Sequence, residues 1–139
     1  MKGTLLAAAL CAVLGTGCPT VDLGETPTEP GACRPDRAYF EDVMWPDFFA
    51  PDDEARSCVD EAACHRIEDG RSALRFETAE PIDQNHNYDV ITRFLNCGAP
   101  EASSALTKPL DGIDEHGGGE LFGAGSAPEE TFLGWFALE

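Results

Sequence analysis

The chain has 139 residues, and its 26 Asp and Glu against 9 Lys and Arg give a formal net charge of −17 at pH 7. This excess of negative charge argues against binding to nucleic acid and against electrostatic binding to anionic lipid headgroups. It is compatible with solubility alone, which we favour, and with docking to a basic partner protein.

Residues 1–17 have the organisation of a secretory signal. Lys2 provides the positive start, and the apolar stretch 5–14 is too short for a membrane span, which needs roughly 20 residues. Small residues then lead to Cys18, a pattern that resembles the lipobox of bacterial lipoproteins, although Gly15 stands where that family usually has Leu. The resemblance implies export, lipidation of Cys18 and anchoring to a membrane on its periplasmic side or at the cell surface. In the competing interpretation, Cys18 is a spare thiol behind an ordinary signal.

Residues 18–32 contain this cysteine and a proline-rich stretch without aromatic residues, which is typical of a flexible tether. The remainder, 33–139, has the length of one small domain. Cys11 leaves with the signal and Cys18 carries the lipid. The four cysteines that remain are Cys33, Cys58, Cys64 and Cys97. An even number in an exported chain indicates oxidised pairs, and the residues themselves leave all three pairings open.

Hydrophobic periodicity predicts a mostly helical domain and therefore the all-α class. A first helix spans 37–45 and ends at Pro46, and a second begins at Pro51 and continues to 65, with acidic residues in its first turn. Residues 72–76 alternate in character and are expected to be extended. The side chains expected to face inward are Tyr39, Phe40, Val43 and Met44 in the first helix, and Ala55, Cys58 and Val59 in the second.

A third helix begins at Asn85 or Asn87 and continues to Cys97, and the segment 102–110 forms a short helical turn that stops at Pro109. The third helix presents an apolar face. Its members are Tyr88, Ile91, Phe94 and Leu95.

A glycine-rich loop over 114–125 precedes the last predicted helix, 126–139. Ser126 and Glu129 have the spacing of a capping box, and Pro128 suits the first turn. The apolar side of this helix consists of Phe132, Leu133, Trp135 and Phe136.

Cys58, Cys64 and His65 form the cluster with the clearest chemistry. A histidine directly after the second of two nearby cysteines is typical of a covalent haem site. The usual loop has two residues between the cysteines, whereas this one has five.

The order of these segments resembles the c-type cytochrome domains of exported bacterial proteins. In that family, a stretch close to P-x-x-S-x-L-x-x-K-P precedes a glycine-rich loop, and a final helix with a tryptophan packs across the first helix. Here the stretch is 100–110 (PEASSALTKPL), the loop contains HGGG at 116–119, and the tryptophan is Trp135. The resemblance covers 39–136 and implies a cytochrome-c-like helical domain.

The resemblance also implies roles for individual residues. Cys58 and Cys64 would form thioethers to the haem, and His65 would bind the iron. The second axial ligand in the family is usually a methionine of the late loop, where this chain has His116 instead. A pair of histidines favours a lower potential than a histidine with a methionine. His86, at a helix start, is a less suitable ligand.

Cys33 and Cys97 have no place in this haem motif, and we interpret them as a disulfide. Two other arrangements remain open. They are Cys33–Cys58 with Cys64–Cys97, and Cys33–Cys64 with Cys58–Cys97.

The resemblance therefore implies a lipid-anchored protein with haem c as cofactor, which transfers single electrons to or from a basic redox partner. We expect no enzymatic activity, because no catalytic constellation stands out. The alternative is a haem-free surface lipoprotein, stabilised by disulfides, that acts as a binding or scaffold module. In that case Cys58 and Cys64 are oxidised to each other. A zinc site from Cys58, Cys64, His65 and another histidine is disfavoured, because an oxidising compartment works against free thiolates.

Overall fold

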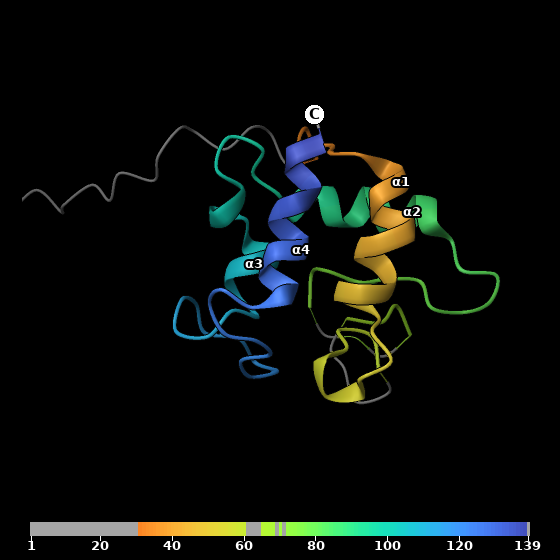
Figure 1. Cartoon of the computed structure of the whole chain (residues 1–139). Helices are drawn as coiled ribbons and strands as arrows, with labels where there is room; N and C mark the ends of the chain where they lie inside the picture. The colour runs from red at the N-terminus through yellow and green to blue at the C-terminus, as the bar shows by residue number, and fades with distance from the viewer. Residues whose placement is uncertain (1–30, 61–64, 69, 71, 139) are drawn as a thin grey trace, which may run out of the picture.

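A computed structural model describes residues 31–60, 65–68, 70 and 72–138 (Figure 1). The expected signal, Cys18, the tether up to residue 30 and Cys64 lie outside the described residues. The domain is helical, which confirms the all-α class, and pairing of extended backbone in the described part is limited to two isolated bridges, Arg66 with Phe76 and Leu110 with Phe122. None of the helices in these ranges is both long and apolar enough to cross a bilayer.

The first helix starts as α1 (Arg37–Tyr39) and continues as a wider π-helix, η1 (Phe40–Phe49). Asp36 caps its start, because the Asp36 carboxylate accepts a hydrogen bond from the Tyr39 amide at 2.6 Å. The predicted stop at Pro46 is wrong. An interior proline lacks a backbone donor and its ring crowds the carbonyl of the preceding turn, yet the wide helix continues past Pro46, and the Ala50 amide closes its last turn on the Trp45 carbonyl at 2.8 Å. The extension buries Phe48 and Phe49, which offsets the lost hydrogen bond.

The last helix, α4 (Ala127–Trp135) followed by η5 (Phe136–Leu138), packs alongside the first helix (Figure 1). Trp135 and Phe40 are both fully buried, and their ring centres lie 5.7 Å apart. The Trp135 indole Nε1 donates to the Asp36 carbonyl at 2.6 Å. The predicted capping box does not form, because the Ser126 side chain makes no cap bond and the Glu129 carboxylate accepts from the Gly125 amide.

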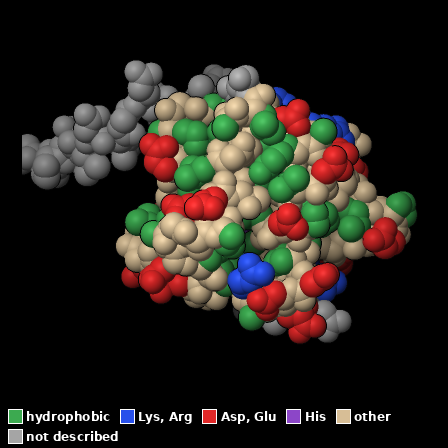
Figure 2. All heavy atoms as spheres, viewed as in Figure 1, with side chains coloured by type: hydrophobic (Ala, Val, Ile, Leu, Met, Phe, Trp, Pro, Cys, Tyr) green, Lys and Arg blue, Asp and Glu red, His purple; other side chains and the backbone are tan. Residues whose placement is uncertain are grey.

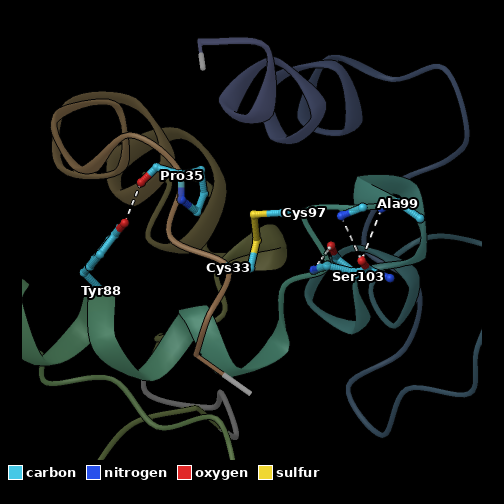
Figure 3. The surroundings of a disulfide bond; sticks show 8 residues. Cys33, Pro35, Tyr88, Cys97, Ala99 and Ser103 are labelled. Carbon is cyan, nitrogen blue, oxygen red and sulfur yellow. Dashed lines mark hydrogen bonds between the residues drawn. A yellow bond between two sulfur atoms is a disulfide. The ribbon is translucent and has the colours of Figure 1, made fainter. Parts of the chain in front are cut away.

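The third predicted helix is α2 (Gln84–Ile91), which ends in the 3₁₀ turn η3 (Thr92–Phe94). Asp83 caps it by accepting from the His86 amide at 3.0 Å. Tyr88 and Ile91 are buried in the core, and the Tyr88 hydroxyl donates to the Pro35 carbonyl (Figure 3). Downstream lie the short turns η4 (Pro100–Ala102) and α3 (Ser104–Thr107), and α3 ends before Pro109 as expected.

A disulfide joins Cys33 to Cys97, with Cα atoms 5.3 Å apart and a sequence separation of 64 (Figure 3). This is the pairing that we preferred from the sequence. The disulfide joins the segment before α1 to the segment after η3.

The predicted second helix over 51–65 is wrong for the residues that the structure describes. Only η2 (Glu54–Arg56) is helical there. The Asp53 carboxylate caps the Ala55 amide and pairs with the Arg56 guanidinium at 2.9 Å, which completes one isolated turn. The chain then becomes extended, and the Cys58 amide bonds to the Phe49 carbonyl at 2.9 Å. Ala55 is therefore exposed.

The prediction that Cys58 and Val59 face inward is correct, because both side chains are partly buried against the core.

The surface visible in Figure 2 carries many acidic and few basic side chains, in agreement with the net charge.

Candidate functional site

An apolar cavity of about 160 Å³ lies beside the core, between the end of η1, the segment around Leu74 and α3. Three residues singled out in the sequence, Cys58, His65 and His116, line it together. Its other walls are Phe49, Ser72, Ala73, Leu74, Phe94, Ser104, Ala105, Lys108 and Pro109.

The rings of His65 and His116 lie close together at this cavity. Their centres are 5.9 Å apart and their planes differ by 17°, although the residues are far apart in the sequence. Two imidazoles that bind one metal ion from opposite sides have ring centres roughly 6 Å apart, given metal–nitrogen bonds of ~2.0–2.1 Å. The separation of the ring centres is therefore compatible with two imidazoles that share one metal ion.

Backbone hydrogen bonds hold His65 in position. The Phe76 amide donates to the His65 carbonyl at 2.7 Å. Of the predicted extended piece 72–76, only Phe76 forms a bridge, with Arg66, and residues 72 and 73 form a bend. The His65 Nδ1 lies 2.9 Å from the Leu74 carbonyl, and the Ser72 hydroxyl contacts both groups. Because a carbonyl only accepts, we assign the proton to Nδ1, which leaves the lone pair on Nε2.

His116 is oriented in the same way by its own loop. The Gly119 amide donates to the His116 carbonyl at 2.9 Å and closes a tight turn. The Gly119 carbonyl then accepts from His116 Nδ1 at 2.8 Å, so the lone pair of this ring is also on Nε2. Metal-binding histidines usually have such a carbonyl partner on the second ring nitrogen.

The surroundings keep His65 neutral, which is the ligand form of imidazole. Burial lowers the pKa of His65, the hydrogen bond to Leu74 raises it, and repulsion from His116 lowers it further, with a lowered pKa as the result. Burial likewise raises the pKa of the Cys58 thiol to about 12. Cys58 is a free thiol, with no disulfide partner in the described part of the chain.

Within the described ranges, no three His, Cys, Asp or Glu side chains converge as metal ligands. The cavity lining contains two imidazoles and the Cys58 thiol. A pair of imidazoles is a donor set that could hold a metal ion already bound by the four nitrogens of a macrocycle. The cavity is smaller than the roughly 300–1,000 Å³ of common ligand pockets, so a porphyrin seated between the imidazoles would extend beyond its walls.

Two other residues considered from the sequence are not among the described lining residues of this cavity, namely Cys64, an expected site residue, and His86, the less suitable ligand. Cys64 lies outside the described residues, so the zinc set that includes it is not tested. His86 does not line the cavity and sits in the first turn of α2.

Sequence reasoning missed the residues that orient the imidazoles. No sequence pattern marks Ser72 or Leu74 as a partner of His65. Their contacts with the His65 Nδ1 form because the folded chain places residues 72–74 beside this ring. His116 itself was singled out, but the glycines that follow it, which form the turn that orients its ring, were interpreted only as part of a glycine-rich loop.

Comparison with known proteins gave no significant match to any family model, curated protein or solved structure.

Proposed function

We propose that this protein binds haem c between His65 and His116 and carries single electrons. The observation that carries the proposal is the parallel placement of the two rings, 5.9 Å apart, each with its Nδ1 bonded to a backbone carbonyl.

The walls of the cavity support the same proposal. Phe49, Leu74 and Phe94 supply apolar surface that would exclude water from a ring and favour its less charged state. Bound haem would supply one-electron chemistry, and ligation by two histidines would tune it toward a low potential.

Cys58 lines this cavity, and Cys64 directly precedes His65 in the sequence. We propose that both form thioethers with the ring, across a loop that bulges to accommodate its five intervening residues. Lipidation at Cys18 would hold the domain at a membrane surface. The net charge of −17 would favour a basic redox partner.

The test is to express the full chain with cytochrome maturation machinery, denature it and record a pyridine haemochrome spectrum. We expect c-type bands, and we expect Cys58→Ser with Cys64→Ser to abolish covalent attachment. His116→Ala should keep the attached haem but convert the native spectrum from low-spin to high-spin. His86→Ala is the matched control and should leave the spectrum unchanged.

The haem-free alternative predicts a different result from the same preparation. It predicts no c-type bands, and a peptide map in which Cys58 and Cys64 are disulfide-linked. That outcome would contradict the proposed function.

A further inference from the structure

Lys108 gives the cavity a charge that differs from that of the rest of the molecule. The chain has 26 acidic residues, yet none of the described residues that line the cavity is Asp or Glu. Apart from the two histidines, Lys108 is the one ionisable cation in this lining. It is also the sole lysine after Lys2 in the whole sequence.

The position of Lys108 is set by α3. Lys108 is the C-cap of this short helix, and Ala105 and Pro109, both buried, line the cavity on either side of it in the sequence. Lys108 lines the cavity although the residue is exposed to solvent. No carboxylate among the described residues forms an ion pair with it.

The position of Lys108 reduces the electrostatic repulsion that an anionic ligand would meet at this protein. A protein with a charge of −17 repels anions, and repulsion is strongest where carboxylates are near. None of the described lining residues is acidic, and the Lys108 ammonium has no carboxylate partner among the described residues, so this cation would attract an anionic group at the cavity.

We infer that the cavity takes an apolar ligand that carries a carboxylate on one edge, and that Lys108 binds this carboxylate. The inference rests on the proposed function: the ligand is the porphyrin, and the carboxylate is one of its propionates. Lys108 thus acts as a positioning residue. It directs the propionate edge of the ring toward the C-terminal end of α3.

The test compares two porphyrins that differ only in this charge. Hemin and hemin dimethyl ester, in which both propionates are esterified, are titrated into the full chain, exported from cells without haem-attachment machinery. Formation of the low-spin absorption spectrum gives the affinity. The variants are Lys108→Gln, Lys108→Arg and, as a matched loss of positive charge at an exposed site that does not line the cavity, Arg93→Gln.

We expect Lys108→Gln to weaken hemin binding by about 3- to 10-fold, the range for a partly solvated charge-assisted contact. The same substitution should leave the affinity for the dimethyl ester unchanged. Lys108→Arg should restore most of the hemin affinity, and Arg93→Gln should match the wild type with both ligands.

Two results would overturn the inference, and they are distinguishable. Low-spin binding of hemin that is insensitive to Lys108→Gln, or an equal loss for the ester, overturns the role of Lys108 and leaves the proposed function intact. Failure of the wild-type chain to form a low-spin complex with either porphyrin overturns the proposed function and this inference with it.

Discussion

His116 owes its orientation to the glycines that follow it. A Cβ on Gly118 would lie 3.2 Å from the His116 Cε1, and Gly119 has a φ of +83°, which favours glycine. The Gly119 carbonyl is the partner of His116 Nδ1. The glycines at 117–119 therefore help to orient the His116 imidazole. Gly118 leaves room for the ring, and Gly119 provides the positive φ and the carbonyl partner.

Substitution of Gly119 by Ala should destabilise the fold by about 1 kcal/mol, because an L side chain at this positive φ is strained. It should also weaken hemin binding, since the carbonyl that orients His116 shifts. Gly117→Ala is the matched control, because Gly117 has an ordinary φ and open space around its Cβ position. Urea unfolding and hemin titration measure both effects, and equal behaviour of the two variants would contradict this account.

At the scale of elements, the pairing of the first helix with α4 organises the core. Phe40 contacts Trp135, and Phe48 contacts Phe132 with ring centres 5.4 Å apart. Two polar bonds fix the register: Trp135 to the Asp36 carbonyl, and the Tyr39 hydroxyl to the Thr131 carbonyl at 3.2 Å. The wide π-helix continues through Pro46 because the longer helix buries Phe48 and Phe49, and this burial stabilises it.

Trp135→Phe should lower the free energy of unfolding by about 2 kcal/mol, from lost packing and from an Asp36 carbonyl left without its donor. Tyr39→Phe removes the other bond between the same helices, in a less buried position, and should cost about 1 kcal/mol or less. Urea denaturation checks the order. A Tyr39→Phe variant less stable than Trp135→Phe would show that the indole bond does not fix the register.

At the scale of the whole molecule, the cavity exists because distant segments are held together. His65 and His116 come from separate loops, and neither lies on a helix. The Cys33–Cys97 disulfide, whose cysteines have a sequence separation of 64, restricts the unfolded chain and thereby favours the folded one.

Replacing Cys33 and Cys97 by Ser should destabilise the domain by about 4 kcal/mol in the loop-entropy account. Cys58→Ser is the control, since Cys58 is a free thiol and its change leaves the loop closed. The measurement is the midpoint of urea unfolding for each variant. A loss no larger than that of Cys58→Ser would mean that the closed loop contributes little.

Local sequence patterns determined the class of the fold and several of its helices. They predicted the all-α class, the apolar faces of α2 and α4 and the stop before Pro109, because periodicity and proline chemistry act over a few residues. The resemblance to c-type cytochrome domains, rather than any local pattern, grouped His116 with Cys58 and His65. The haem itself stays a prediction.

Tertiary structure alone decided the rest. Burial of aromatic rings carried the first helix past Pro46, and the bond from Cys58 to Phe49 turned the chain away from the predicted second helix. The carbonyl of Leu74 and the charge of Lys108 reach the cavity only after the chain has folded. These features depend on contacts between residues far apart in the sequence, and local patterns carry no record of such contacts.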